Sequence, residues 1–323
     1  MKKFLVFILF FTFFIFSCKE VKFDYSYLVE NVKNDNYREL SKASKDVLLD
    51  FKDEKGRNII HYCAINNSYK TLNFLLSQTD FRKIINEKDR YGNSPLKFAI
   101  LKGYLNIVKI LIENGADIHL RDNFLGFTPI MTASFNSKKE IVLFLYSKGA
   151  NIKDRDLKFN MSIPYWLVRK RDMDMLKFFL QDIGYREKDV EGLLLEACFV
   201  YNTSKETLEY LYNLYPLSID YKDDEGINCL MACMISKNFY QADFIIKKNK
   251  KLSFLKDKYS QNFIDHFFVN VDEKDKNEEE KLVELLKKNF SDVEIKKILL
   301  SSEIYNSLDY TKKVEIFNKI LGD

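Results

Sequence analysis

Apolar residues in this chain recur every three to four positions, in short stretches separated by polar turns. The stretch Ile107-Val108-Lys109-Ile110-Leu111-Ile112 is typical, and Ile141-Val142 and Met175-Leu176 begin similar ones. This spacing places the apolar side chains on one face of a helix, whereas a half-buried strand would alternate at every second residue. The pattern therefore predicts an all-α chain made of short amphipathic helices.

The helical stretches are punctuated by glycines at a regular interval. Two series are spaced by 36 and 34 residues and by 34 and 35 residues: Gly56, Gly92 and Gly126, and Gly115, Gly149 and Gly184. Ser260 follows Gly226 at a distance of 34 residues, in a matching context. Glycine at a fixed period marks turns and helix ends that need left-handed backbone geometry. A structural repeat of about 34 residues follows from this spacing.

The segments around these glycines resemble the ankyrin repeat, whose pattern is near D-x-x-G-x-T-P-L-H-x-A. The clearest copy runs from Asp89 to Ala99, and the next reads Gly126-Phe127-Thr128-Pro129-Ile130, with Ala133. Weaker copies begin near residues 53, 162, 187, 223 and 257. The resemblance covers residues 53–269. It implies an all-α ankyrin-repeat helical solenoid of about six to seven repeats with helical caps.

The repeat pattern has a physical cause. Ser94 and Thr128 stand where a side-chain oxygen caps the first helix of a repeat, and Pro95 and Pro129 follow where a missing N–H costs nothing. The small residue in the Ala position lets neighbouring helices approach closely. One helix pair cannot bury its apolar face alone, so the copies are expected to stack. Copies four and five have weak turns, and we expect them to fold within the stack but to open more readily.

The two ends of the array are expected to act as caps. Residues 24–52 look like a degenerate helical first unit, an N-terminal helical cap. Residues 270–323 hold a charge run at 272–280, which is most simply a solvated linker or a helix start, and a C-terminal helical cap. Within it, the stretch 282–286 suits the second helix of repeat seven, and two further helices are predicted at 291–300 and 310–321. The pattern leaves open whether this tail is a polar-faced cap or a small helical appendage.

The N-terminus has the features of an export sequence. Lys2 and Lys3 precede an apolar run of 13 residues, which is shorter than the about 20 residues a membrane-spanning helix needs. The run ends at Ile15-Phe16-Ser17-Cys18, which resembles the lipobox of bacterial lipoproteins. The resemblance implies a signal peptide at 1–17, lipidation of Cys18, a lipidated tether at 18–23 and a place in the cell envelope. The periplasmic and surface faces are both open. A plain secretory signal with an incidental cysteine is the alternative.

Residue usage gives no support to an enzyme. The chain of 323 residues is 46% hydrophobic and 30% charged, and its net charge of +4 is too balanced for a nucleic-acid surface. Phosphate-binding, zinc-protease and nucleophile-elbow motifs do not occur, and Ser253-x-x-Lys256 is expected by chance in a lysine-rich chain. We therefore expect no catalytic residue and no cofactor.

The cysteines admit one other chemistry. Cys229 and Cys233 are spaced to share a helix face, but no further ligand lies at zinc-site spacing, so no metal is expected. A disulfide between Cys198 and Cys233 is not expected either, because packed helices lie about 8–10 Å apart, beyond the reach of a disulfide.

The ankyrin resemblance implies binding of a protein on the concave face, which turn tips and first helices form. Phe124, Leu125 and Phe127 crowd one tip, and apolar groups in that position favour a partner interface. The alternative is that one or two of them pack against the neighbouring tip. A basic patch at 169–171 is most simply solvated, or meets an acidic partner or phospholipid headgroups. The carried-over candidates are Arg57, Tyr91, Asn93, Lys102, Phe124, Leu125, Phe127, Phe135, Arg169 and Lys170.

Together these observations predict a monomeric, membrane-tethered protein-binding scaffold with no nucleic-acid partner. The membrane contact would be made by N-terminal acyl chains. Three other functions stay open: an envelope immunity protein that sequesters a specific client enzyme, an enzyme with its site in residues 270–323, and a purely structural envelope protein.

Lipidation at Cys18 has a direct test. Cys18→Ala removes the thiol that the diacyl group would be attached to, so the variant is expected to leave the detergent phase and appear in the aqueous phase, because several acyl chains are needed for stable anchoring. Phase partitioning of the two proteins measures this. Retention of the variant in the detergent phase would contradict the lipobox interpretation.

Overall fold

A computed structural model describes residues 25–185, 190, 192–270, 276–308 and 310–321. Over these residues the regular structure is helical, with isolated bridges such as that between Lys222 and Asn228. None of the described helices is both long and apolar enough to cross a bilayer. The predicted signal peptide (1–17), the tether (18–23) and Cys18 lie outside the described residues. The chain divides into two compact units, residues 1–160 and 161–323, which are described separately.

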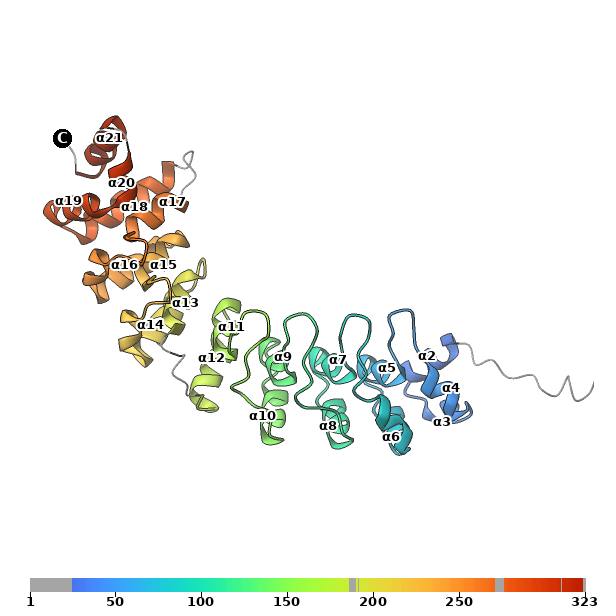
Figure 1. Cartoon of the computed structure of the whole chain (residues 1–323). Coiled ribbons are helices and arrows are strands. Elements are labelled where there is room, and N and C mark those ends of the chain that lie inside the picture. The colour runs from blue at the N-terminus through green and yellow to red at the C-terminus, as the bar shows by residue number, and fades with distance from the viewer. Residues whose placement is uncertain (1–24, 186–189, 191, 271–275, 309, 322–323) are drawn as a thin grey trace, which may run out of the picture. The chain divides into compact units, whose positions relative to one another are not determined.

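Unit 1 (1–160) is built of helix pairs stacked in two rows (Figure 1). The first helices of three pairs pack one against the next: α5 (Ile59–Asn66), α7 (Pro95–Lys102) and α9 (Pro129–Phe135). Their second helices form the other row: α6 (Tyr69–Leu76), α8 (Leu105–Glu113) and α10 (Lys139–Ser147). The predicted all-α stack of helix pairs is confirmed.

The segment predicted as an N-terminal cap continues both rows. Its α2 (Tyr25–Lys33) packs on α5, and its α3 (Tyr37–Leu40) packs on α6. A further short helix, α4 (Lys45–Asp50), contacts the 3-10 turn η1 (Thr79–Ile84). Residues 25–50 thus provide one more helix pair at the start of the stack.

The first helices begin at polar caps and interlock through them. Asn58 and His61 form a reciprocal capping box at the start of α5. Burial lowers the pKa of His61, which favours the neutral ring. Its Nδ1 accepts the N–H of Asn58, so Nε2 carries the proton and donates to the carbonyl of Asn93, 3.0 Å away in the next repeat. The cap of one repeat therefore also holds the following turn.

Small residues set the distance between stacked first helices. Cys63, Ala99 and Ala133 occupy the same position in α5, α7 and α9, and each is completely buried. The second helices supply the larger apolar groups, such as Ile107, which is equally buried. Each such side chain contributes about 1.5–3 kcal/mol by leaving water. This burial exists only between neighbours, so a repeat depends on the one beside it.

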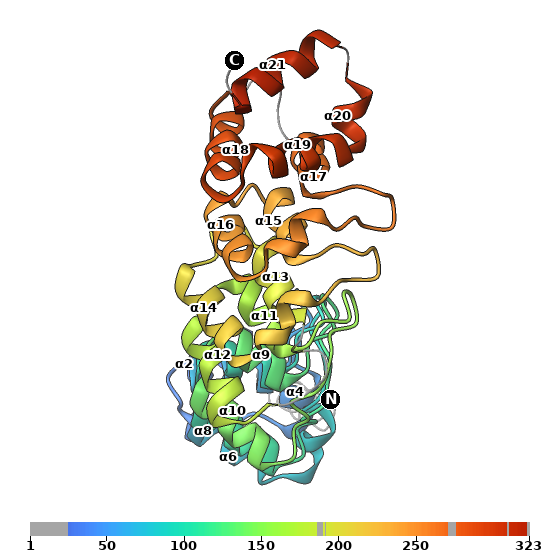
Figure 2. The ribbon, with the colours of Figure 1, turned by 90° about the vertical axis from the view of Figure 1, so that its left-hand side faces the viewer.

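Unit 2 (161–323) repeats the same arrangement (Figure 2). Its first helices are α11 (Ile163–Lys170), α13 (Leu193–Phe199), α15 (Cys229–Ile235) and α17 (Phe263–Asn270). The second helices are α12 (Met173–Lys177), α14 (Lys205–Leu214), α16 (Phe239–Lys248) and α18 (Lys276–Asn289). Shorter turns follow three of these: a π-helical turn η2 (Phe178–Asp182), η4 (Pro216–Asp220) and η5 (Lys250–Phe254).

The C-terminal helices extend the rows of unit 2. Because α18 packs on α16, the stretch 282–286 does belong to the second helix of the last repeat, as predicted. Beyond it, α20 (Glu303–Ser307) contacts α17, and α21 (Tyr310–Leu321) contacts α18. The predicted helices at 291–300 and 310–321 correspond to α19 (Asp292–Ser301) and α21, whereas α20 was not predicted. The tail is thus a cap on the end of the stack.

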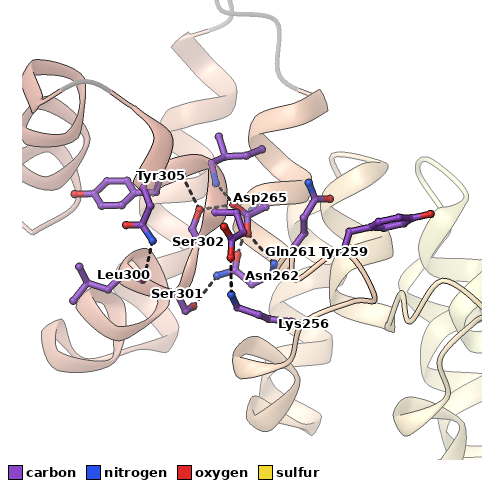
Figure 3. Close-up of polar contacts among 12 residues, drawn as sticks. Lys256, Tyr259, Gln261, Asn262, Asp265, Leu300, Ser301, Ser302 and Tyr305 are labelled. Atoms are coloured by element: carbon purple, nitrogen blue, oxygen red, sulfur yellow. Dashed lines mark hydrogen bonds and ion pairs between the residues drawn. The ribbon is translucent and has the colours of Figure 1, made fainter.

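A buried carboxylate attaches this cap (Figure 3). Asp265 is completely buried, and its Oδ1 accepts the Ser302 hydroxyl at 2.5 Å and the Ile304 N–H at 2.7 Å. Its Oδ2 accepts the N–H of Asn262 at 2.8 Å, while the Asn262 amide donates to the Ile298 carbonyl at 3.1 Å. Asn262 and Asp265 occupy the positions that Asn58 and His61 hold in the first repeat. The residues at these two positions thus bind the following turn in the first case and the C-terminal cap in the second.

Removing this carboxylate should loosen the C-terminal cap. Asp265→Ala leaves buried donors of Asn262, Ser302 and Ile304 without an acceptor, so we expect the free energy of unfolding of unit 2 to fall by about 3 kcal/mol. Hydrogen exchange should accelerate in α20 and α21. The matched control is Lys256→Ala, which breaks the exposed Lys256–Glu303 ion pair between the same segments and should change stability by less than about 1 kcal/mol. Equal effects of the two substitutions would contradict this account.

Candidate protein-binding surface

Four turn segments of unit 1, called fingers here, precede the first helices. Each starts with an aspartate that accepts backbone N–H groups of its own finger; Asp89, for example, accepts from Tyr91 at 3.0 Å and from Asn93 at 2.8 Å. Such side-chain bonds fix a short turn without help from a sheet. The fingers are Asp53–Arg57, Asp89–Asn93, Asp122–Phe127 and Asp156–Asn160.

Three of the fingers turn at a glycine with positive φ, and the fourth turns at an asparagine. Asn160 has a φ of 54°, which takes the place of the glycine that repeat four lost. The glycines also allow contact with the next finger. A Cβ on Gly92 would lie 2.4 Å from Cβ of Asn123, so any larger residue there would collide. Gly126 approaches Leu157 in the same way.

Backbone hydrogen bonds join neighbouring fingers. The N–H of Arg90 donates to the carbonyl of Lys55 at 2.8 Å, and the N–H of Leu157 donates to the carbonyl of Leu125 at 2.9 Å. Because each finger is fixed to its own aspartate and to its neighbour, the tips form a preformed row, which is called the finger row below.

Charged groups at the base of the finger row are paired within the protein. Arg57 lies 3.5 Å from the buried carboxylate of Asp89 and 4.9 Å from the ring centre of Phe98. Burial acts to raise the pKa of Asp122, but hydrogen bonds from Lys97 and from backbone N–H groups outweigh it, so this pKa lies below its usual value. These ion pairs stabilise the fingers, so the charges in them are already neutralised within the protein.

The tips of the row carry large apolar groups in solvent. Phe124 is 74% exposed, Leu157 72% and Tyr91 64%. Lys158 Nζ lies 5.4 Å from the ring centres of both Phe124 and Phe159. A shallow depression lies beside Phe124 and Leu157, and its lining includes Lys88, Arg121, Asp122, Asn123, Leu125 and Lys158. Exposed aromatic and apolar groups next to cations are typical of a surface that binds a protein.

The structure separates the predicted candidates of unit 1 into exposed, half-buried and buried residues. Tyr91, Lys102 and Phe124 are exposed, as a binding residue must be. Phe127 is only 6% exposed and its ring packs edge-on against Phe135 at 5.8 Å, so the prediction that it faces a partner is wrong. The reason is its place after Gly126, where the chain already enters α9. The half-buried candidates are Arg57, Asn93, Leu125 and Phe135.

The predicted basic patch of unit 2 is largely satisfied internally. Arg169 Nε lies 2.5 Å from Glu196 Oε1, and Lys170 Nζ lies 3.2 Å from Asp172. Arg171 ends α11 in the left-handed conformation, with a φ of 60°. Both candidates thus keep an intramolecular carboxylate partner.

Two residues of the surface were missed at the sequence level. Leu157 and Lys158 lie in the fourth finger, which has no glycine to mark its turn. The spacing between its aspartate and its positive-φ residue could have identified this finger. The positive-φ residue follows the aspartate by four positions in the third finger (Asp122 to Gly126) and again in the fourth (Asp156 to Asn160).

Comparison with known proteins agrees with this architecture. Residues 26–122 match the family model for ankyrin repeats, in three copies. These residues are thus similar to ankyrin repeats. The matched stretch starts at residue 26 and therefore includes the helix pair α2 and α3.

Ankyrin repeat proteins from distant sources are similar to the chain. One from Acanthamoeba polyphaga mimivirus is 21% identical over 71% of this chain and 33% of its own length. One from Rickettsia bellii is 36% identical over 32% of this chain and 42% of its own length. An IkB-like protein of African swine fever virus is 30% identical over 40% of this chain and 57% of its own length. The chain thus spans a third to somewhat over half of these relatives.

Two phenylalanines of the third finger, Phe124 and Phe127, should differ strongly in how much they contribute to stability. Phe127→Ser removes a buried ring and should lower the free energy of unfolding by about 3 kcal/mol. Phe124→Ser removes an exposed ring and should change it by less than about 0.5 kcal/mol. Urea unfolding of the two variants measures this. A large loss of stability in Phe124→Ser would place that ring in the core and remove it from the binding surface.

Proposed function

We propose that this chain is a non-enzymatic scaffold that binds a protein partner through the finger row of unit 1. The observation that carries the proposal is the group of exposed apolar side chains, Tyr91, Phe124 and Leu157, on a row whose backbone is already fixed. A preformed surface loses little conformational entropy on binding, so more of the contact energy appears as affinity.

The buried thiols and polar groups of the described residues contribute to packing and to contacts between helices. Burial raises the pKa of the Cys63 and Cys198 thiols, and a hydrogen bond with Cys198, together with burial, raises the pKa of the Cys229 thiol; both effects favour the unreactive protonated form. In the described ranges, no group of three or more His, Cys, Asp or Glu side chains is arranged to hold a metal ion. The buried polar residues near the C-terminus, Asn262, Asp265 and Ser302, bind one another and join helices.

We further propose that the scaffold is held at a membrane of the cell envelope. The support is the sequence of residues 1–18, in which a basic start and an apolar run lead to Cys18. A lipid on Cys18 would place the ankyrin repeats beside the membrane and confine the search for a partner to its surface. Protease treatment of intact and permeabilised cells separates the two faces. Digestion of the repeats in intact cells indicates the surface, and protection until permeabilisation indicates the periplasm.

Partner capture tests the surface itself. Phe124→Ser combined with Leu157→Ser should reduce recovery of cross-linked partner from cells by about tenfold or more, because it removes two exposed apolar contacts at once. The control is Leu217→Ser in unit 2, which removes a side chain that is 85% exposed, and it should leave recovery unchanged. Equal recovery with both variants would show that the finger row is not the binding surface.

A further inference from the structure

Two pairs of fingers, one in each unit, share the same backbone geometry. In unit 2 the N–H of Lys258 donates to the carbonyl of Glu225 at 3.0 Å, as the N–H of Arg90 does to the carbonyl of Lys55 in unit 1 at 2.8 Å. Each acceptor lies two residues after its finger aspartate, at Asp223 and Asp53. Lys55 is therefore equivalent to Glu225, and Arg90 is equivalent to Lys258.

The side chains at these equivalent positions differ in charge: they form an ion pair in unit 2 and are two cations in unit 1. In unit 2, Lys258 forms an ion pair with Glu225, and the hydroxyl of Tyr259 donates to the same carboxylate at 2.7 Å. In unit 1 the carboxylate is replaced by a second cation, so Lys55 and Arg90 occupy the positions of a pair with like charge. Tyr91 stands where Tyr259 stands, and it is 64% exposed. The tip that is neutralised in unit 2 is thus left cationic in unit 1.

The excess of positive charge extends along the finger row. Lys88 and Lys158 are also exposed; over the described ranges neither these two lysines nor Lys55 and Arg90 have a carboxylate oxygen within 4.0 Å. Among the residues of the four fingers, Glu54 is the single exposed acid, since the finger aspartates are buried or half-buried. Other cations of unit 1 do have carboxylate partners: Lys42, Lys45, Lys52, Arg57, Lys83, Lys97 and Arg121.

We propose that the finger row of unit 1 receives an acidic segment of a partner protein that also carries an aromatic or aliphatic side chain. Carboxylates of the segment would meet Lys55, Lys88 and Arg90, and its apolar group would pack on Phe124 and Leu157. Like charges without a partner weakly oppose folding, and an external anion removes that repulsion. The alternation of cations with apolar groups fits a peptide better than a phosphate backbone. This inference rests on the proposed protein-binding function and names the chemistry of the partner.

Selection of short random peptides on the full chain tests the proposal. The enriched peptides should be rich in Asp and Glu and contain an apolar residue, and their affinity should fall as NaCl rises from about 0.05 M to about 0.5 M. Lys55→Glu combined with Arg90→Glu should lower the affinity for these peptides by about tenfold or more, because attraction to the acidic residues becomes repulsion. The control Lys258→Glu reverses a charge on the equivalent finger of unit 2, and it should lower the affinity for these peptides by less than about twofold. Thermal unfolding of each variant checks that the fold is intact.

Four results would overturn the proposal. One is enrichment of peptides without excess acid, and another is no enrichment at all. A third is acidic peptides that lose affinity with Phe124→Ser but not with the double charge reversal; this result would retain the proposed function while rejecting the acidic partner. The last is binding of phosphatidylglycerol vesicles that depends on Lys55 and Arg90 in the absence of peptide binding, which would assign the cations to lipid headgroups.

Discussion

A single helix pair of this chain cannot bury its apolar face, and the rest of the structure follows from that constraint. Small residues such as Ala99 bring neighbouring first helices together, and apolar residues of the second helices fill the space between pairs. Polar caps then make the stacking specific, because the residue three positions after the helix cap forms a hydrogen bond with the following repeat or with the C-terminal cap. His61 does this at one end with a ring nitrogen, and Asp265 does it at the other with a carboxylate.

This constraint explains why much of the fold could be predicted from the sequence. Helix spacing and repeat period are local properties, so the helix pairs, the small residues between them and the last helix α21 were predictable. The short helix α20 was not, since its attachment depends on Asp265, a residue that departs from the repeat pattern. Leu157 and Lys158 of the fourth finger were missed because asparagine at a positive φ replaces the expected glycine there.

The binding surface was only partly predictable, because exposure depends on where a turn enters a helix. Phe124 and Phe127 are three residues apart in the same finger, yet one is 74% exposed and the other 6%. Charge pairing was equally hidden, since the partners of Arg57 and Arg169 come from neighbouring repeats. The structure therefore moves the candidate surface toward the tips, which carry the exposed rings and cations such as Lys88, whose Nζ donates to the amide oxygen of Asn123 rather than to a carboxylate.

The central claim is that a protein partner contacts the finger row rather than the outer row of second helices. A photo-crosslinking benzoylphenylalanine placed at Phe124 or at Leu143, which is 49% exposed on α10, tests it most directly in cells. We expect a covalent adduct with a partner protein from position 124 and none from position 143. Adducts from position 143 alone would place the partner on the opposite row and contradict it.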